Sequence, residues 1–248
     1  MHVISVTNQK GGCGKTTTSV NLSAFLARRG KATLLIDIDP QGAATTGLGV
    51  DKWSLDKTIY DVLIGEASLE EVVIQTKVPN LYLAPTNINL SGAVPELTGQ
   101  IGREYLLKEK LDHVEGYDYI IIDTPPSLDL LTINALVAST EILVPIQTEY
   151  YALEGMSQLL KIVDMVEKRL GTKLSRRFLL TMFDSRTKLS NEVADRVKAH
   201  FKDEVFQTII PRNIRLAEAP SYGEPICMYD PESSGAKAYE RLAEEVLG

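Results

Sequence analysis

A glycine-rich segment near the N-terminus carries the residues best suited to bind a chain of phosphates. It reads Lys10-Gly11-Gly12-Cys13-Gly14-Lys15, followed by Thr16, Thr17 and Thr18 at the start of a predicted helix. Glycines allow backbone N–H groups to turn toward one point, and the helix N-terminus adds partial positive charge there. In such a loop Lys15 would reach the β- and γ-phosphates, and the Thr16 hydroxyl would bind Mg²⁺. The residues from Lys10 to Thr18 are therefore predicted to bind a nucleoside triphosphate.

The loop departs from the usual phosphate-loop pattern at one end. Gly14, Lys15 and Thr16 close the pattern correctly, but Gln9 stands where the opening glycine belongs. A second lysine, Lys10, precedes the paired glycines. The competing interpretation is an ordinary glycine-rich turn that connects a strand to a helix. The phosphate site is favoured because the motif lies between a predicted strand and a predicted helix.

Carboxylates follow two of the apolar segments that are predicted to be strands. Asp37 and Asp39 come directly after residues 32–36, and Asp123 ends the run 117–122. The carboxyl ends of parallel strands border the crevice in which such sheets bind ligands. We therefore expect Asp123 to hold Mg²⁺ together with Thr16, directly or through water. Strand-end aspartates also form turns and helix caps, and Asp37 is expected to support the loop geometry.

Strand-length apolar runs alternate with helical patterns along the whole chain. Strands are expected at 2–6, 32–36, 81–85, 117–123, 141–147, 178–183 and 205–210. Helices are expected from Thr16 and at 58–65, 103–113, 149–170, 189–201 and 234–247. This alternation predicts an α/β fold, with a doubly wound, mostly parallel sheet and helices on both faces. Residues 1–248 are predicted to form a single domain, and residues 43–50 a mobile loop.

Composition excludes several classes of protein. With 44% hydrophobic and 24% charged residues, the chain can bury a core and is not disordered. Its two cysteines, Cys13 and Cys227, are too few for a disulfide framework, which favours the cytoplasm. No signal peptide or membrane-spanning run is apparent. The formal net charge of −7 argues against a uniformly basic nucleic-acid binder, although it permits a local basic patch.

The phosphate motif resembles that of one group of P-loop proteins. KGGCGKTTT is similar to the deviant Walker A box of the ParA/MinD ATPases, whose usual form is KGGxGKT[ST]. DIDPQG at 37–42 and DTPPS at 123–127 resemble the other motifs of that group. The resemblance implies that Lys10 reaches the phosphates bound by the partner subunit of an ATP-dependent homodimer. It also implies that Asp39 positions the attacking water, with Lys10 and Lys15 stabilising charge on the transferred phosphoryl group.

Two further segments resemble the chromosomal ParA branch of the group, namely TEYYALEG at 148–155 and PRNIRLAEAP at 211–220. The resemblance places Pro211 and Asn213 beside the adenine, with Met182 close by. Glu149 is expected either to contact the nucleotide or the dimer partner, or to be a surface helix cap. Because the guanine signature NKxD is absent from the sequence, ATP with Mg²⁺ is predicted rather than GTP.

A basic region lies near the C-terminal end of the predicted sheet. Residues 172–216 contain ten Lys or Arg and five Asp or Glu. Within it, Arg186, Lys188, Arg212 and Arg215 lie at predicted strand–helix junctions. Phosphate neutralisation by such a patch gives salt-sensitive DNA binding without sequence preference, whereas a solvated charged face is the alternative. Arginines matching Arg186 and Arg215 bind non-specific DNA in chromosomal ParA proteins, so the resemblance favours double-stranded DNA.

The resemblance implies a nucleoid-associated switch for chromosome or plasmid partitioning, whose slow ATPase activity a ParB-type centromere-binding partner stimulates. The main alternative is a MinD-like, membrane-associated ATPase for division-site placement. That class should end in a basic amphipathic helix, whereas this chain ends in the acidic segment AKAYERLAEEVLG. No membrane partner is therefore expected. An iron–sulfur protein of the same fold would need paired cysteine ligands, which Cys13 and Cys227 do not resemble.

Overall fold

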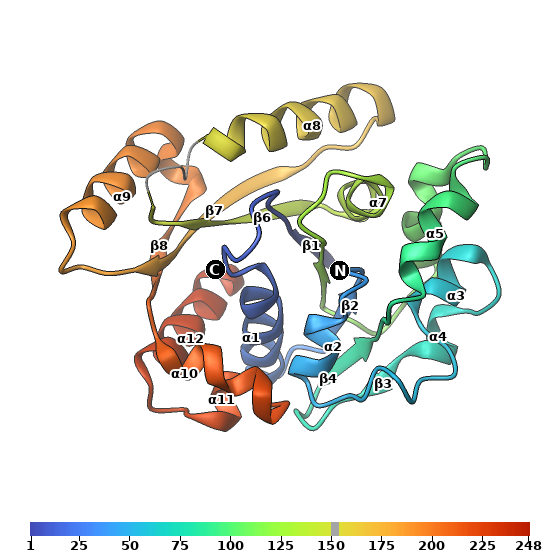
Figure 1. Ribbon diagram of the computed structural model, residues 1–248, viewed down its shortest axis with the longest axis horizontal. Coiled ribbons are helices and arrows are strands. Elements are labelled where there is room, and N and C mark those ends of the chain that lie inside the picture. The colour runs from blue at the N-terminus through green and yellow to red at the C-terminus, as the bar shows by residue number, and fades with distance from the viewer. Residues whose placement is uncertain (150–153) are drawn as a thin grey trace.

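A computed structural model describes residues 1–149 and 154–248 of the chain (Figure 1). The strands in these residues form one eight-stranded sheet, and they are β1 His2–Val6, β2 Thr33–Asp37, β3 Ile74–Gln75, β4 Leu81–Ala84, β5 Tyr119–Asp123, β6 Glu141–Gln147, β7 Ser175–Phe183 and β8 Val205–Pro211. Their order is β3-β4-β2-β5-β1-β6-β7-β8. Only β3 and β4 pair antiparallel among the described strands. The predicted α/β fold with a mostly parallel sheet is confirmed.

Helices cover both faces of this sheet (Figure 1). They are α1 Lys15–Arg28, α2 Ala43–Gly47, α3 Ile59–Ile64, α4 Leu69–Val72, α5 Leu90–Leu97, α6 Leu106–Leu111, α7 Leu130–Ala138, α8 Glu154–Leu170, α9 Lys188–Phe201, α10 Ile214–Glu218, α11 Ile226–Tyr229 and α12 Ser234–Leu247. Three short 3₁₀ helices are η1 Arg103–Tyr105, η2 Lys202–Glu204 and η3 Ala219–Tyr222. Helices α1, α2, α11 and α12 pack against one face of the sheet and enclose a hydrophobic core there. Helices α3 to α9 pack against the other face and enclose the hydrophobic core on that side.

The central strands are buried from both sides, which explains their unbroken apolar runs. In β5, Ile121 packs into the core beneath α1, whereas Ile120 and Ile122 pack into the core beneath α3 to α7. Successive side chains of a strand point to opposite faces, so a strand covered on both faces needs apolar residues at every position. The run ends at Asp123, where the strand reaches the edge of the sheet that carries the loops.

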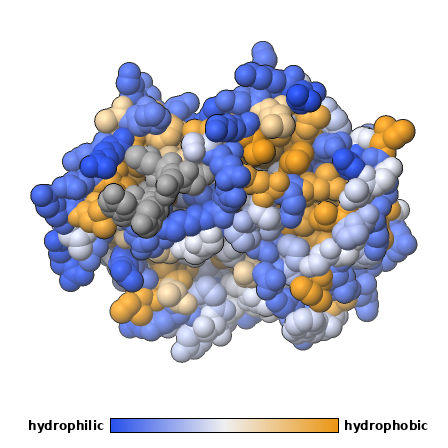
Figure 2. All heavy atoms as spheres, turned by 45° about the horizontal axis from the view of Figure 1, so that its top comes forward, coloured by the Kyte–Doolittle hydropathy of each residue, from blue (hydrophilic) through white to orange (hydrophobic). Residues whose placement is uncertain are grey.

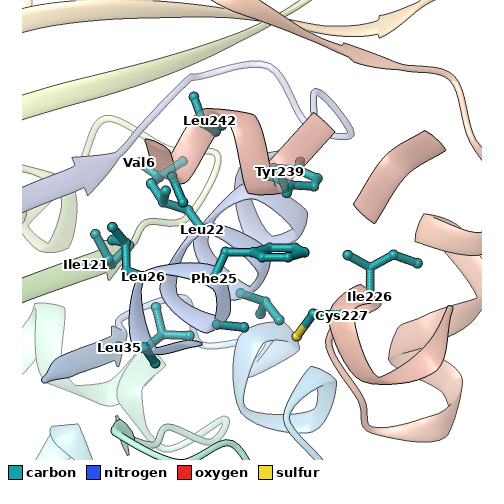
Figure 3. Close-up of a cluster of buried hydrophobic side chains, with 14 of the residues drawn as sticks. Val6, Leu22, Phe25, Leu26, Leu35, Ile121, Ile226, Cys227, Tyr239 and Leu242 are labelled. Atoms are coloured by element: carbon teal, nitrogen blue, oxygen red, sulfur yellow. The ribbon is translucent and has the colours of Figure 1, made fainter. Parts of the chain in front are cut away.

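Helix α1 joins the phosphate loop to the core. Its apolar residues face the sheet and the closing helix α12, as Figure 3 shows for Leu22, Phe25 and Leu26. Their partners include Val6, Leu35, Ile121, Tyr239 and Leu242. Burial of each of these large side chains stabilises the fold by about 1.5–3 kcal/mol. The start of α1 is therefore held firmly, and with it the loop that precedes it.

Several element boundaries differ from the sequence-based expectations. Residues 43–47 form the helix α2 and not a loop, because Gly42 adopts φ +63° and Ala44 and Thr45 are buried beneath the strands. The helix expected at 103–113 is divided into η1 and α6, and β7 begins at Ser175 rather than at residue 178. The segments β3, α4, α5, α7, α10 and α11 were not predicted. The helix expected from residue 149 is described from Glu154 onward, since residues 150–153 lie outside the described part.

The described surface is largely hydrophilic on the face shown in Figure 2, where hydrophobic side chains form separate groups. Large hydrophobic side chains that are exposed include Trp53, Ile101, Ile214 and Tyr222. None of the helices described here is long and apolar enough to cross a membrane.

Candidate functional site

The glycine-rich loop connects the end of β1 to the first turn of α1. Gly12 and Gly14 have φ values of +70° and +93°, which glycine adopts without strain. Cys13 between them is fully buried, and its carbonyl accepts a hydrogen bond of 2.8 Å from the Thr181 hydroxyl on β7. Because Cys13 is anchored inward, the loop backbone curves around the N-terminus of α1. This is the geometry that exposes backbone N–H groups to an anion.

The side chain of Lys15 lies within this curve. It is 7% exposed, and its Nζ donates to the carbonyl of Lys10 at 3.2 Å. A lysine ammonium carries three donors, so a single carbonyl partner leaves capacity for phosphate oxygens. Lys15 therefore lies inside the loop, with donors available for an anion.

The carboxylate of Asp123 lies directly beside the start of α1. It accepts hydrogen bonds from the Thr16 hydroxyl at 2.8 Å and from the Ser19 hydroxyl at 2.7 Å. Asp123 pairs in register with Val6 of β1 and with Asp37 of β2, which brings the ends of three strands together. Thr16 and Asp123 thus meet as the sequence predicted. Ser19, one turn after Thr16, was missed, although its i, i+3 spacing places it on the same helix side.

Three buried carboxylates, those of Asp37, Asp39 and Asp123, lie at this end of the sheet. Burial, followed by the nearby Asp123 charge, raises the pKa of Asp37 from 3.8 to about 8. Burial also raises the pKa of Asp123 from 3.8 to about 6, although the Ser19 and Thr16 hydroxyls lower it. Removal from water disfavours the charged form of a carboxyl group, and a second carboxylate disfavours it further. A cation placed beside Asp123 would relieve this cost.

The Asp37 carboxylate accepts hydrogen bonds from both Asp39 and Thr45 of α2, and so connects the two. The Asp39 N–H donates to Asp37 Oδ1 at 3.2 Å, and Asp39 Oδ1 accepts from the Gln41 N–H at 2.9 Å. The other oxygen, Asp37 Oδ2, accepts from both the N–H and the hydroxyl of Thr45 at 2.8 Å. Asp37 therefore supports the local geometry, and Asp39 lies nearby in a turn that its own carboxylate stabilises.

Lys10 is paired with a residue of the same chain. Its Nζ lies 3.2 Å from Glu149 Oε2, and Gln147 Nε2 donates to Glu149 Oε1 at 2.5 Å. The side chains of Lys10 and Glu149 are 35% and 54% exposed, so both are accessible from solvent. Residues 150–153 of the predicted TEYYALEG motif lie outside the described residues. The structure thus brings Glu149 to the phosphate loop by way of Lys10.

An apolar cavity of about 370 Å³ opens beside the loop. The predicted adenine neighbours Met182, Pro211 and Asn213 all line it, together with Gly14 and Thr17 of the phosphate motif. Lining residues for which the sequence predicted no place in this cavity are Thr181, Ile210, Arg212, Ile214, Leu216, Ala217 and Tyr239. Nothing in the sequence near Tyr239 indicates this role, since it belongs to the closing helix α12. Its buried hydroxyl lies 3.0 Å from that of Thr18.

The four predicted DNA-binding residues are all exposed. Arg186 precedes α9 and Lys188 begins it, whereas Arg212 follows β8 and Arg215 lies on α10. Arg186 and Arg212 border one hollow of about 390 Å³ that also includes Pro211. The structure thus brings the junctions after β7 and β8 to one surface, next to the cavity described above.

Solved structures of other proteins resemble this fold. The chain is similar to cobyrinic acid a,c-diamide synthase of Mycobacterium smegmatis with bound ATP analog and magnesium, at a TM-score of 0.88 and 35% identity, covering 100% of this chain and 94% of that one. It also resembles the cell division ATPase MinD of Pyrococcus furiosus, at a TM-score of 0.80 and 31% identity, with 99% and 98% covered. These similarities extend over the entire sheet and its helices.

Sequence comparison gives the family. An AAA domain family model matches residues 1–176. The sporulation initiation inhibitor protein Soj of Bacillus subtilis is 55% identical over 98% of this chain and 97% of its own length. The chromosome-partitioning ATPase Soj of Treponema pallidum is 50% identical over 97% and 94%, and the chromosome partitioning protein ParA of Caulobacter vibrioides is 44% identical over 100% and 94%. The chain therefore belongs to the ParA/Soj family of chromosome-partitioning ATPases.

Proposed function

We propose that this protein is a switch that pairs with a second copy when it binds ATP, and then binds DNA without sequence preference. The observation that carries the proposal is the arrangement of Lys10 and Lys15 on one phosphate loop. Lys15 is buried at the N-terminus of α1, whereas Lys10 extends to the accessible surface. One lysine would bind the phosphates of its own subunit, and the other those of the partner.

The residues beside the loop fit Mg²⁺ with a triphosphate. No group of three or more His, Cys, Asp or Glu in the described residues could hold a metal ion. Mg²⁺ in nucleotide sites needs few protein ligands, because phosphate oxygens and water supply the rest. Thr16 and Asp123 would hold it, and when bound it would neutralise charge on the phosphates. The adenine would occupy the cavity lined by Met182, Pro211 and Asn213.

Hydrolysis would depend on the position of Asp39. Its carboxylate accepts the Gln41 N–H in the turn after β2, and we propose that a small rotation would let it orient a water toward the γ-phosphate. Lys10 and Lys15 would stabilise the charge on the transferred group. Turnover would be slow until a ParB-type protein stimulates it, and loss of the γ-phosphate would separate the two subunits.

The DNA surface would be formed by Arg186, Lys188, Arg212 and Arg215. Pairing of two subunits doubles this surface, so the second contact to DNA becomes intramolecular and the affinity rises steeply. Such a protein would reside on the nucleoid in the cytoplasm. We further propose that residues 1–248 act as one ATPase domain, since α12 packs back onto α1 and β8.

A MinD-like membrane function is less well supported. The apolar residues of α12, including Ala238, Tyr239 and Leu242, are buried against the core. A helix whose apolar face is already packed cannot lay that face into a lipid interface. The similarity to MinD therefore extends to the fold and does not add a membrane partner.

The test is co-sedimentation of the protein with DNA in ATP, ADP or no nucleotide, across a series of salt concentrations. We expect retention with ATP that falls as salt rises. Asp39→Ala should remain dimeric and DNA-bound with ATP, whereas Lys15→Ala should bind neither nucleotide nor DNA. A wild-type protein that stays monomeric when saturated with a non-hydrolysable ATP analogue would refute the proposal.

A further inference from the structure

Arg186 of the basic surface is neutralised by a carboxylate of its own chain. Its Nε donates to Asp184 Oδ1 at 2.9 Å, and its Nη2 donates to Asp184 Oδ2 at 2.7 Å. Such a fork is the strongest arrangement of an arginine with a carboxylate. Hydrogen bonds from Arg186 also lower the pKa of Asp184 from 3.8 to about 2, so this carboxylate is ionised at neutral pH. The Arg186 side chain is nevertheless 86% exposed, so the pair faces solvent.

Arg215 is compensated in the same way. Its Nη1 donates to Glu218 Oε2 at 2.9 Å, and its Nε lies 3.3 Å from Asp230 Oδ2. The Glu218 carboxylate is held in place by a second hydrogen bond, of 3.1 Å, from the Tyr229 hydroxyl. Thus both arginines that the family resemblance assigns to DNA carry a fixed acidic partner.

Arg212 differs from these two arginines. It is exposed and forms no ion pair with the portion of the chain that the structure describes, although its charge contributes, after that of Arg186, to the lowered pKa of Asp184. Lys188 has only a 3.5 Å pair with Glu192 one helical turn away. Of these four cations, Arg212 is therefore the one without an ion pair among the described residues, and Lys188 has the longest pair.

We propose that Asp184 and Glu218 are internal counter-charges that keep the DNA affinity of a single subunit low. The inference rests on the proposed function, in which this surface binds DNA. A phosphate that approaches Arg186 meets a guanidinium whose charge is already balanced, and it is repelled by the carboxylate behind it. Affinity for DNA grows with the number of uncompensated cations that displace counterions. Compensation therefore makes DNA binding depend on pairing of two subunits, and hence on ATP.

The substitutions that test this retain the local structure. In Asp184→Asn the amide oxygen can still accept the Arg186 N–H, which now donates to Asp184 Oδ1 at 3.1 Å. In Glu218→Gln the amide oxygen can still accept from Tyr229. The matched control is Glu66→Gln, which removes the same charge from an exposed turn between α3 and α4, at the opposite end of the sheet. Thermal melting would verify that all variants fold.

DNA binding is measured by fluorescence anisotropy with a duplex of random sequence, in ATP and in ADP, across a salt series. We expect Asp184→Asn to bind several-fold more tightly than wild type with ATP. The slope of log affinity against log salt should steepen by about one per subunit. The double variant with Glu218→Gln should also bind in ADP, whereas Glu66→Gln should match wild type. Adding Arg186→Ala to Asp184→Asn should abolish the gain.

An unchanged or weaker affinity of Asp184→Asn would overturn the inference, because the carboxylate would then serve to hold Arg186 for phosphate. The outcome for wild type is separate. If wild type fails to bind DNA with ATP, the proposed function fails. In that case binding by the double variant would still support internal compensation, and absence of binding by it would refute that inference as well.

Discussion

Replacing Asp37 with asparagine should flatten the pH dependence of stability in the nucleotide-free protein. The pKa of Asp37 is raised in the folded state from 3.8 to about 8, first by burial and then by Asp123. A carboxyl group with a raised folded pKa contributes stability that is present below pH 4 and is lost as pH rises toward 8. Each pH unit in this window costs about 1.4 kcal/mol, so the Asp37 contribution falls by up to about 3 kcal/mol between pH 5 and 7.

The substitution also has a cost that does not depend on pH. Asp37 accepts hydrogen bonds from Thr45 and Asp39 on two different oxygens, whereas asparagine offers one acceptor oxygen and turns an NH₂ group toward a donor. An unsatisfied buried group of this kind costs about 1–3 kcal/mol. The stability of the variant should therefore lie within about 1.5 kcal/mol of wild type at pH 5 and exceed that of wild type at pH 7, where the Asp37 contribution has fallen by about 4 kcal/mol from its value below pH 4.

The assay is urea unfolding, followed by circular dichroism at pH 5, 6, 7 and 8 with EDTA and without nucleotide. Asp195→Asn, at an exposed position of α9, is the control, and it should give a curve parallel to that of wild type. If the free energies of unfolding of Asp37→Asn and wild type also run parallel across this range, Asp37 does not titrate as its burial requires. The reasoning would then be wrong.

Two further predictions concern the backbone and the phosphate loop. A Cβ on Gly223 would lie 2.5 Å from the Cα of Gly49, so Gly223→Ala should destabilise the protein by about 2–4 kcal/mol in urea unfolding. Gly30→Ala has a similar positive φ but no atom within 4 Å of the new Cβ, and it should cost only about 1 kcal/mol; equal losses would contradict the contact. Glu149→Gln should free Lys10 and strengthen dimerisation with a non-hydrolysable ATP analogue by up to about five-fold per subunit. Analytical ultracentrifugation would detect this, and weaker dimerisation would instead mean that Glu149 orients Lys10.

The sequence by itself determined the fold class and the phosphate loop, because both follow from patterns of residues that are close together in the chain. Unbroken apolar runs such as residues 119–122 indicate parallel strands covered on both faces. Asp123 follows this run at the carboxyl end of its strand, which lies beside the phosphate loop. The spacing of Gly14, Lys15 and Thr16 is likewise a property of consecutive residues. Short elements such as β3 and α2 were missed or misjudged, since their few residues gain stability from contacts that lie far away in the sequence.

Only the tertiary structure decided which residues far apart in the sequence form ion pairs or line the same cavity. Tyr239 reaches the cavity because α12 packs on α1, and Glu149 pairs with Lys10 although 139 positions separate them. The carboxylates of Asp184 and Glu218 lie close to their arginines in sequence, yet a count of charges alone could not tell paired side chains from free ones. Hydrogen-bond geometry and burial fix these partnerships, and both arise only when the chain has folded.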